Sequence, residues 1–433
     1  MAKCVVIGGG FAGLASSAFL SKNNIPVLLL EASPKLGGRA YSFKHKRQKN
    51  FIDNGQHILM GCYSNTLELL ELINARRNFF FQDKLNLTLR NHSAQEFSLN
   101  ASRGFYPVNL LMAILKFDAF DYPDKLKIIK FFTGLIFDKN KKLTGMTVSQ
   151  MLKERKQSDK IIKMLWEILT VGALNTDIHS ASASLFNKVL KEVFFKGNFA
   201  SKIIIPKSDL TNAYVIPAKK YIEEKGGEII QPENVKEFIT YNNKIVALKT
   251  GRRTINDFDC VISAIPFFAL TKIKNNPLQI TLDKSKIKYS PILSVHLWLK
   301  KNNFNKQFYG LIESPIHWLF NHGKFITLVT SNAKEFLQTP KEKIFNEFLD
   351  EISNFFPEFD KNEVFDYQVI IEKRATFIPT NEYEKERQKI RSQFSNLFLA
   401  GDWVNTGLPS TIESAVKSGK IAAGNAVNWI RKH

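Results

Sequence analysis

The sequence has only three cysteines and no long uninterrupted apolar segment. Cys4, Cys62 and Cys260 lie far apart without C-x-x-C spacing, which argues against a disulfide framework or a zinc site and favours a reducing compartment. No segment reaches the roughly 18 consecutive apolar residues of a membrane-spanning helix. A glycine-rich segment begins within the first ten residues and leaves no room for a secretory signal peptide. We therefore expect a cytoplasmic protein with no transmembrane helix, disulfide or metal site.

Acidic residues are also fewer than basic residues. The chain has 61 Lys and Arg against 40 Asp and Glu, which gives a formal net charge of +21. No basic stripe or known nucleic-acid-binding module accompanies this charge, so we do not expect nucleic acid as a partner. Two interpretations remain open. The charge attracts the protein to an anionic membrane surface, or it reflects an AT-rich coding composition that also enriches Asn, Ile and Phe.

The most informative segment is N-terminal, Val5-Val6-Ile7-Gly8-Gly9-Gly10-Phe11-Ala12-Gly13-Leu14, followed by Val27-Leu28-Leu29-Leu30-Glu31. It predicts a strand, a tight glycine turn, a helix, a second strand and then an acid, the pattern of a dinucleotide-binding fold. Gly8 permits the turn, Gly10 lets the backbone approach a pyrophosphate, and Gly13 lets the helix pack on the strand. The helix N-terminus offers free N–H groups to phosphates. Glu31 is placed to accept hydrogen bonds from both ribose hydroxyls, which excludes NADP because a 2′-phosphate would be repelled.

A second glycine pair follows this acid, in Lys35-Leu36-Gly37-Gly38-Arg39-Ala40. A domain that binds only NAD does not need it, whereas FAD is longer and must be carried further along the sheet edge. Gly37 and Gly38 would let the backbone approach FAD, and Arg39 would offset phosphate charge. Taken alone, the segment also fits an ordinary surface turn.

The C-terminal region supplies a matching motif. Asn396-Leu397-Phe398-Leu399-Ala400-Gly401-Asp402 predicts an apolar strand that ends in Gly-Asp, and a loop and a helix follow. Ser410 and Glu413 have capping-box spacing. The helix carries a stripe of mostly small residues, Ile412, Ala415, Val416, Gly419, Ala422 and Ala423. Its N-terminus would point at the flavin ring and favour negative charge on the reduced flavin. No cysteine lies nearby, so we expect non-covalent FAD.

These three segments together resemble the flavin-containing amine oxidase and phytoene desaturase superfamily. Other segments resemble its squalene-associated branch, whose members are hydroxysqualene dehydroxylases of bacterial hopanoid and squalene synthesis. They are Asp53-Asn54-Gly55-Gln56-His57, His317-Trp318-Leu319-Phe320-Asn321, Glu372-Lys373-Arg374-Ala375-Thr376 and Gly401-Asp402-Trp403 through Glu413. The resemblance is dense at both termini and thin between residues 80 and 200.

The resemblance implies an α/β fold, with a Rossmann-like, glutathione-reductase-like FAD-binding domain that is discontinuous in sequence and an α+β substrate domain. We assign residues 1–80, 205–269 and 370–433 to the FAD-binding domain, and 81–204 and 270–369 to a substrate- and membrane-facing domain. A length of 433 residues fits two to three domains. The sequence predicts a strand at 226–230, a hairpin at 234–248 and a returning strand at 259–264. The resemblance implies that the strand at 259–264 rejoins the FAD-binding sheet.

The resemblance also implies site residues. The expected FAD-binding residues are Gly8, Gly10, Phe11, Ala12, Gly13, Glu31, Ala32, Gly37, Gly38, Arg39, Asn54, Gly55, Val235, Gly401, Asp402, Thr411, Ile412 and Ala415. His317, Trp318, Arg374 and Trp403 are expected to line the substrate pocket. Asp53 is the first candidate for a general acid, provided that burial raises its pKa. His57 is the second candidate and Gln56 an accompanying polar group. Asp53 also fits a purely structural turn beside FAD.

The reaction implied by the resemblance is reductive dehydroxylation of hydroxysqualene to squalene. It needs an acid at the leaving hydroxyl, hydride from reduced flavin and a dry apolar pocket. It also needs a lipid isoprenoid substrate, an electron donor for FAD and an upstream squalene or hydroxysqualene synthase. A carotenoid-type desaturase or isomerase acting on a C30 or C40 polyene remains the alternative, and an amine oxidase or a non-enzymatic flavoprotein is less favoured.

Two helical regions carry further expectations. Residues 64–77 are predicted to form a helix, with Asn65 and Glu68 at its cap and Leu67, Leu70 and Ile73 on one face. Between residues 104 and 137, positions 105–117 are nearly all apolar, and a second apolar run at 128–137 is flanked by Lys125, Lys127 and Lys130. This region is too short to span a bilayer. This pattern fits either a monotopic membrane-dipping surface or buried core helices. The first interpretation predicts a protein peripheral on the cytoplasmic face of the inner membrane, held there partly by Phe131 and Phe132.

Overall fold

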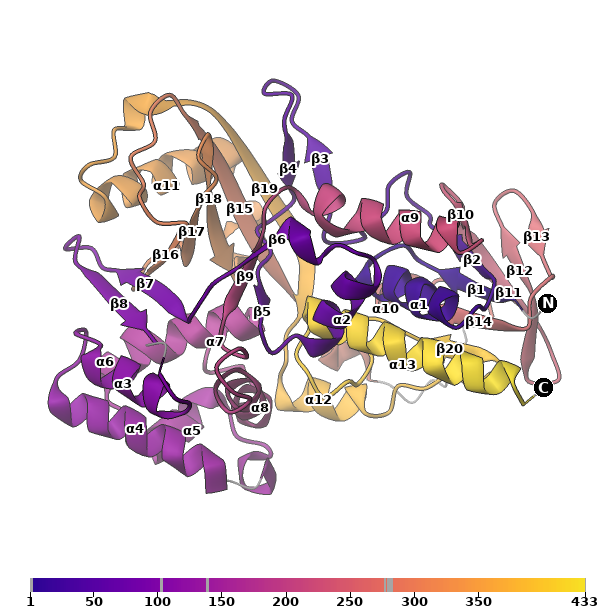
Figure 1. Cartoon of the computed structure of the whole chain (residues 1–433), viewed down its shortest axis with the longest axis horizontal. Helices are drawn as coiled ribbons and strands as arrows, with labels where there is room; N and C mark the ends of the chain where they lie inside the picture. The colour runs from indigo at the N-terminus through magenta and orange to yellow at the C-terminus, as the bar shows by residue number, and fades with distance from the viewer. Residues whose placement is uncertain (1–2, 102–103, 138–139, 276–277, 279–282, 433) are drawn as a thin grey trace.

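The chain folds around two β-sheets that lie at opposite ends of an elongated molecule (Figure 1). The structure is a computed structural model that describes residues 3–101, 104–137, 140–275, 278 and 283–432. Two of the predicted domain segments (1–80 and 370–433) therefore include ends, and two others (81–204 and 270–369) include internal stretches, that fall outside the described residues. We call the two halves the parallel-sheet lobe and the mixed-sheet lobe.

The parallel-sheet lobe is assembled from segments far apart in sequence. Its five strands, in the order β10-β2-β1-β14-β20, are all parallel. They are β10 (Glu228–Ile230), β2 (Val27–Leu30), β1 (Cys4–Ile7), β14 (Cys260–Ser263) and β20 (Leu397–Leu399). The predicted α/β fold with a discontinuous Rossmann-like sheet is confirmed.

Both faces of this sheet are covered, as its continuous apolar strands require. Cys4 and Val6 face the helices, whereas Val5 and Ile7 face the other side. Helices α1 (Phe11–Lys22), α2 (Ser64–Leu72), α9 (Ile216–Glu224) and α13 (Ile412–Ile430) form one layer. The other face packs against the sheet formed by β11 (Val235–Tyr241), β12 (Lys244–Thr250) and β13 (Thr254–Ile255), and against α10 (Phe267–Leu270).

Three positions of the parallel-sheet lobe require glycine. Gly8 is required by its backbone conformation, and Gly13 and Gly419 are required by close backbone contacts. Gly8 has φ +102°, a conformation that side chains disfavour. A Cβ at Gly13 would lie 1.7 Å from the Gly8 carbonyl oxygen, so α1 could not approach β1 with any larger residue there. A Cβ at Gly419 would lie 2.4 Å from the Ala12 carbonyl oxygen, which explains how α13 packs directly on α1.

Two expected helix caps differ from the structure. The side chain of Thr411, not Ser410, caps α13 by accepting a hydrogen bond from the Ser414 N–H at 3.2 Å. Glu413 instead caps α2 from outside, since it accepts from the backbone N–H groups of Asn65 at 3.0 Å and Thr66 at 2.9 Å. Helix α2 is also shorter than predicted and ends at Leu72.

The mixed-sheet lobe contains a seven-stranded sheet in the order β19-β15-β18-β17-β16-β7-β8, antiparallel except for the β16–β7 pair. The strands are β19 (Val364–Phe377), β15 (Tyr289–Leu299), β18 (Phe325–Ser331), β17 (Trp318–Asn321), β16 (Phe308–Leu311), β7 (Asn86–Arg90) and β8 (Glu96–Asn100). Helix α11 (Lys341–Phe355) packs on the face that carries Leu293, Val295 and Leu297. The opposite face carries Ile292 and faces a layer of helices.

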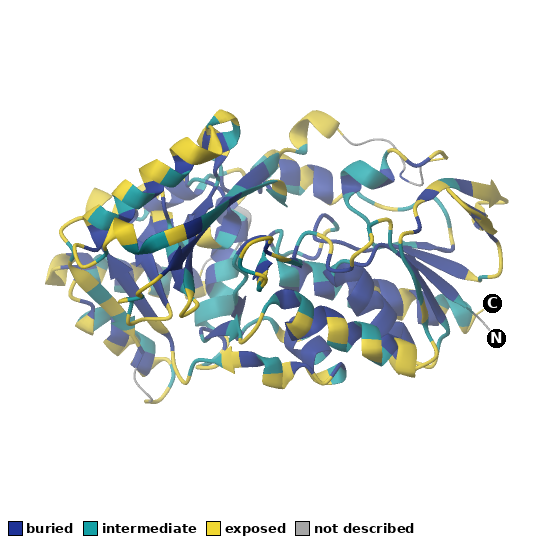
Figure 2. Ribbon diagram, turned by 90° about the horizontal axis from the view of Figure 1, so that it is seen from above, coloured by how far each residue is buried: buried dark blue, intermediate teal, exposed yellow. Residues whose placement is uncertain are grey.

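That helical layer holds α3 (Val108–Lys116), α4 (Tyr122–Phe137), α5 (Val148–Glu154), α6 (Asp159–Ile161), α7 (Glu167–Leu174) and α8 (Ala183–Phe194). Between the lobes lie the β3–β4 hairpin (Ser42–Lys44 and Phe51–Asp53), the small β5-β9-β6 sheet (Leu59–Met60, Ile203–Pro206 and Phe79–Phe81) and α12 (Asn381–Arg387). Figure 2 shows that the strands of both sheets are mostly buried and that exposed residues gather on the outer faces of the helices.

The expectation for residues 104–137 is only partly supported. Phe131 is 2% exposed and packs on Trp166, with ring centroids 4.4 Å apart, and Phe132 packs against Phe194. These two side chains therefore do not form a lipid-facing surface. The exposed aromatic residues of this region are Phe105, Tyr122 and Phe137, at 83%, 66% and 84% exposure. Among the described residues, no helix is both long and apolar enough to cross a bilayer.

Candidate active site

One continuous cavity of about 1110 Å³ runs from the parallel-sheet lobe into the mixed-sheet lobe. The glycine turns and the N-terminus of α13 line one end. The other end, which we call the apolar arm, lies between the seven-stranded sheet and helices α7 and α8. The cavity therefore joins a dinucleotide-type site to a long apolar space.

The glycine end brings together nearly all of the residues expected to bind FAD. Those that line it are Gly8, Gly10, Phe11, Ala12, Glu31, Ala32, Gly37, Gly38, Arg39, Asn54, Gly55, Val235, Gly401, Asp402, Thr411, Ile412 and Ala415. Gly13 does not line the cavity, because it lies at the packing contact between α1 and β1. Residues from both ends and from the middle of the chain thus form one elongated site.

Glu31 is held rigidly at this end. One carboxylate oxygen accepts the Gly9 N–H at 2.6 Å, and the other accepts the Ser33 N–H at 2.7 Å. Each carboxylate oxygen can accept a second hydrogen bond. Glu31 is therefore oriented by the turn and still has acceptor capacity for hydroxyl groups of a ligand.

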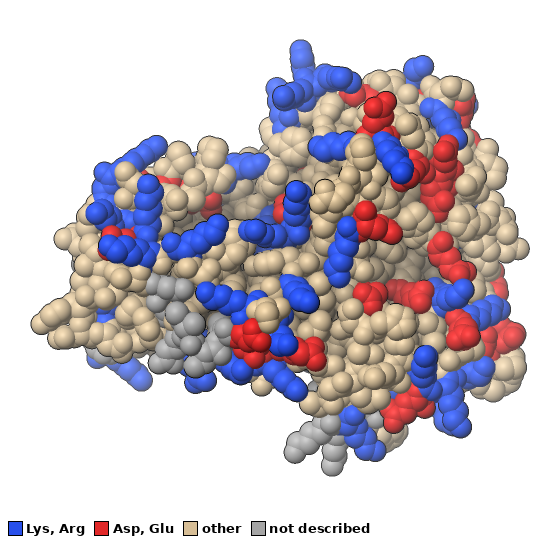
Figure 3. Space-filling view, turned by 180° about the vertical axis from the view of Figure 1, so that it is seen from behind, with Lys and Arg blue, Asp and Glu red and all other residues tan. Residues whose placement is uncertain are grey.

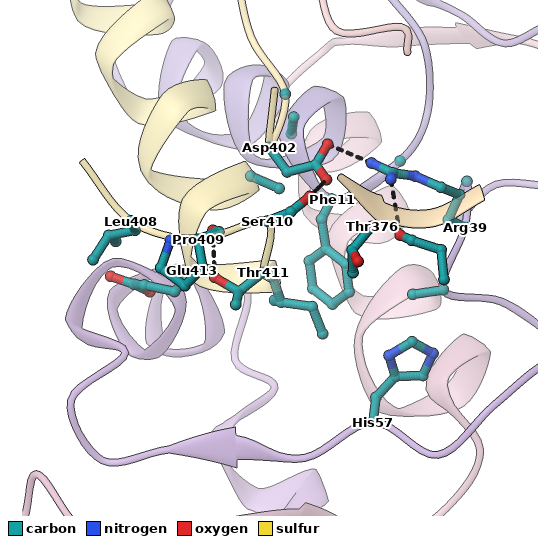
Figure 4. A pocket seen from close by; sticks show the side chains of 18 of the residues that line it. Phe11, Arg39, His57, Thr376, Asp402, Leu408, Pro409, Ser410, Thr411 and Glu413 are labelled. Atoms are coloured by element: carbon teal, nitrogen blue, oxygen red, sulfur yellow. Dashed lines mark hydrogen bonds and ion pairs between the residues drawn. The ribbon is translucent and has the colours of Figure 1, made fainter. Parts of the chain in front are cut away.

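Arg39 has a protein partner that its sequence position does not reveal. Its guanidinium forms an ion pair with Asp402 and donates a hydrogen bond to the Ala375 carbonyl at 3.0 Å. Ser410 donates to the other oxygen of Asp402. Figure 4 shows this chain of contacts beside Phe11 and the start of α13. Arg39 thus joins the second glycine pair to the C-terminal motif, and Asp402 neutralises much of the charge that was expected to offset phosphates.

Arg387 is a site residue that the sequence analysis missed. Its side chain is 1% exposed and donates to three backbone carbonyls of the loop before α13, those of Asp402 at 2.6 Å, Leu408 at 2.6 Å and Val404 at 2.8 Å. These bonds fix the loop that carries Ser410 and Thr411. Arg387 lies in a charged helical segment, so its sequence context predicts only a solvent-exposed side chain.

The apolar arm follows one face of the seven-stranded sheet. Cross-strand partners carry its lining from strand to strand: Ile292 pairs with Ser331, Val329 with Trp318, Phe320 with Phe308 and Leu87 with Leu99. Because β15 and β8 are five steps apart, the arm extends about 24 Å at roughly 4.8 Å per step. Ile168, Leu169, Phe186, Val189 and Leu190 of α7 and α8 form the opposite wall.

Of the three catalytic candidates, His57 and Gln56 line the cavity and Asp53 does not. Burial lowers the pKa of His57 to about 4, and its buried Nε2 has no hydrogen-bond partner among the described residues. Figure 4 shows His57 below Phe11, apart from the charged groups. The structure thus provides a neutral imidazole with an unused ring nitrogen beside the cavity.

Asp53 is buried behind the cavity wall. One carboxylate oxygen accepts hydrogen bonds from the Ser42 hydroxyl at 2.7 Å and the Leu210 N–H at 2.9 Å. Burial raises the pKa of Asp53 to about 7, as its proposed role required. Its position nevertheless argues against direct contact with a substrate, because the β3–β4 hairpin directs it towards the segment before α9.

Of the four residues that were expected to line the substrate pocket, two line the cavity and two do not. Trp318 and Trp403 line the cavity, whereas His317 and Arg374 do not. The His317 Nδ1 accepts the Ser331 N–H at 3.1 Å, and Arg374 is exposed with its guanidinium 4.3 Å from the Phe268 ring. Adjacent positions on a strand face opposite sides, which separates His317 from Trp318.

Trp318 is accommodated by two glycines. A Cβ at Gly172 or at Gly310 would lie 3.1 Å from its indole ring. The sequence analysis missed several polar cavity residues, among them Lys188 and Glu192 on α8 and Lys417 on α13. Within the described residues, no cluster of side chains could hold a metal ion.

Comparisons with known proteins match this chain to a family of flavin-containing enzymes. The family described as flavin containing amine oxidoreductase matches residues 11–427. The chain is 28% identical to the hydroxysqualene dehydroxylase of Zymomonas mobilis over 426 residues, which cover 98% of each chain. It is 22% identical to the 15-cis-phytoene desaturase of Narcissus pseudonarcissus, over 98% of this chain and 79% of that relative.

A solved structure shows the same fold. An oxidoreductase from Methanosarcina mazei superposes with a TM-score of 0.75 at 17% identity, covering 96% of this chain and 98% of that chain. The family match spans nearly the whole sequence and includes the second glycine pair, Gly37 and Gly38, and most of the C-terminal helix. The chain belongs to the flavin containing amine oxidoreductase family.

Proposed function

We propose that this protein is an FAD-dependent enzyme that reduces hydroxysqualene to squalene. The observation that carries the proposal is the continuity of the cavity, which joins the glycine-lined end to an apolar arm about 24 Å long. The similarity to a hydroxysqualene dehydroxylase over the full length of both chains supports the same reaction.

The residues present fit FAD. The two glycine turns approach each other at Gly10 and Gly38, where a Cβ at Gly10 would lie 3.6 Å from the Gly38 Cα. Without side chains, the backbone of both turns is accessible to a ligand. Glu31 would hold the ribose, the N-terminus of α1 the pyrophosphate, and Thr411 and Ile412 at the start of α13 the flavin ring. All three cysteines are free, and Cys62 lines the cavity near Glu413 of α13. We propose that FAD is bound non-covalently. Bound and reduced, FAD would supply the hydride.

The apolar arm performs the second task, which is to exclude water. Loss of an allylic hydroxyl generates a cation that water would recapture. Trp318, Phe320, Phe308, Leu87 and Leu99 would surround an isoprenoid chain without offering a nucleophile. His57 lines the cavity, and its low pKa keeps the imidazole neutral in this dry environment.

A desaturase or isomerase acting on a C30 or C40 polyene is the second candidate. The apolar arm would accept a polyene equally well, and the similarity to a 15-cis-phytoene desaturase spans almost all of this chain. The two reactions differ in the direction of electron flow, because desaturation would reduce the flavin.

We further propose that the protein is peripheral on the cytoplasmic face of the inner membrane. There it would receive its lipid substrate from an upstream squalene or hydroxysqualene synthase and electrons from a separate donor. The exposed Phe105 and Phe137 support contact with lipid. Basic side chains lie over both lobes on the face seen in Figure 3, which suits an anionic surface and does not form a single stripe.

The test is an anaerobic single turnover. Flavin-loaded protein is photoreduced and mixed with hydroxysqualene in detergent, and squalene is measured by mass spectrometry while flavin reoxidation is followed. We expect squalene in proportion to the flavin oxidised. If folded, flavin-loaded protein makes no squalene but its oxidised flavin is reduced by a polyene, the desaturase alternative replaces this proposal.

A further inference from the structure

Lys188 places an ammonium group in the wall of the largely apolar arm. It lies on α8 between Phe186 and Val189, and all three residues line the cavity. A Cβ at Gly407 would lie 2.2 Å from the Lys188 Nζ, so the ammonium is directed towards the loop that leads into α13. This loop also carries the residues expected to surround the flavin ring, which places Lys188 near the junction of the cavity's two ends.

The Lys188 ammonium group is free to bind a ligand, although other charged side chains lie near it. Within the described residues, its Nζ has no hydrogen bond or ion pair. Lys417, which also lines the cavity, donates to the Thr406 carbonyl at 3.0 Å and is therefore engaged. Burial first, and then the positive charges of Lys417 and Arg387, lower the pKa of Lys188, while Glu192 and Glu384 oppose that shift.

The proposed reaction needs a proton at the oxygen that leaves. Asp53 does not reach the cavity, and His57 with a pKa of about 4 is neutral near pH 7. A neutral imidazole can bind the hydroxyl but is a weak acid. Lys188 carries a proton, lines the cavity and has no competing acceptor, so it meets the requirements for a general acid.

We propose that Lys188 is the catalytic residue that protonates the leaving hydroxyl, an inference that rests on the proposed dehydroxylase function. The carbon–oxygen bond breaks with both electrons going to oxygen, the oxygen takes a proton from the Lys188 ammonium, and water leaves. The allylic cation gains two electrons and one proton as a hydride from reduced flavin, which an external two-electron donor must have reduced.

Glu192 provides a route for returning the proton to Lys188. It lies one helical turn further along α8, also lines the cavity, and its side chain is 32% exposed. A carboxylate that reaches both cavity and solvent can carry a proton inward after each turnover. Glu192 is in this sense a positioning and relay residue and does not contact the reacting atoms.

Leaving-group dependence separates the acid role from a structural one. Lys188→Met and the control Lys153→Met, at an exposed position on α5, are compared on hydroxysqualene and on its allylic chloride, which departs without a proton. General acid catalysis contributes about 100- to 10,000-fold, so we expect Lys188→Met to lose at least 100-fold on the alcohol. On the chloride it should stay within about threefold of wild type, as Lys153→Met should on both substrates.

Each other outcome overturns the proposal. Equal losses on both substrates would make Lys188 structural, and full activity on the alcohol would exclude it as the acid. If His57→Gln shows the chloride rescue instead, the acid is His57. If wild-type protein makes no squalene from either compound, the dehydroxylase function itself fails, and the role of Lys188 fails with it.

A second measurement does not depend on turnover. An amine-selective reagent followed by peptide mass spectrometry reports the reactivity of each lysine against pH. We expect Lys188 to react at lower pH than Lys153 and to be protected by squalene, which would occupy the arm. In turnover, the rate on the alcohol should fall as pH rises through the lowered pKa of Lys188, and Lys188→Arg should shift that fall to higher pH. Labelling that squalene does not affect would place Lys188 outside the substrate site.

Discussion

Replacing Phe105 and Phe137 by serine should weaken binding to lipid vesicles by about two to four orders of magnitude. These side chains are 83% and 84% exposed, so the folded protein gains little from them in water. Burying a phenylalanine in an apolar environment stabilises by about 1.5–3 kcal/mol, and two together give about 3–6 kcal/mol. At about 1.4 kcal/mol per tenfold change, that loss corresponds to the stated range.

The assay is sedimentation of the protein with vesicles that contain anionic lipid. The matched control is Phe365→Ser with Tyr241→Ser, which changes two side chains that are 50% and 69% exposed. Phe365 lies on β19, at the opposite edge of the sheet from β8, on which α3 packs. The control should bind vesicles as wild type does.

Phe131→Ser should behave differently from both. Phe131 is 2% exposed, and removing a buried phenylalanine side chain costs about 3–5 kcal/mol of unfolding free energy. We expect a lower midpoint of thermal unfolding rather than a specific loss of lipid binding. Vesicle binding that is unchanged in the Phe105 and Phe137 double variant, or reduced equally in the control, would refute the assignment of this surface.

Three further predictions follow from buried contacts. Gly13→Ala should abolish flavin absorbance in the purified protein, because its Cβ would lie 1.7 Å from the Gly8 carbonyl oxygen, whereas Gly424→Ala, with no atom within 4 Å, should be neutral or slightly stabilising. Arg387→Met should cost at least about 1–3 kcal/mol in chemical denaturation and release flavin, since it leaves the buried Asp402 carbonyl and two partly buried carbonyls without this donor. Burial raises the pKa of Asp53 from 3.8 to about 7, so its favourable contribution to folding is full below about pH 4 and is lost as pH rises through 7. Asp53→Asn should flatten that part of the stability profile and retain turnover, and a large loss of turnover would restore Asp53 as a catalytic candidate.

The sequence determined the parallel-sheet lobe in most respects. Short-range rules fix a strand, a glycine turn and a helix, because a positive φ at Gly8 and a close contact at Gly13 admit almost no other residue. The same rules located the strand and helix of the C-terminal motif. They placed the caps of α2 and α13 wrongly because Glu413 reaches a helix 347 positions away in sequence.

The site was predictable where backbone recognises a ligand and not where side chains do. Seventeen residues expected near FAD do line the cavity, since glycine spacing reports backbone geometry directly. Asp53 and His57 stand four positions apart, yet only His57 lines the cavity. Which of the two reaches it depends on how the β3–β4 hairpin packs against the segment before α9.

The sequence by itself therefore determined the nucleotide-type fold and the family, because both are written in local backbone requirements. Tertiary structure alone decided that Arg39 pairs with Asp402, that Phe131 is buried while Phe137 is exposed, and that Lys188 lines an apolar arm. These facts depend on contacts between segments far apart in the chain. Burial and charge pairing are properties of the assembled neighbourhood, and periodicity along one segment cannot specify them.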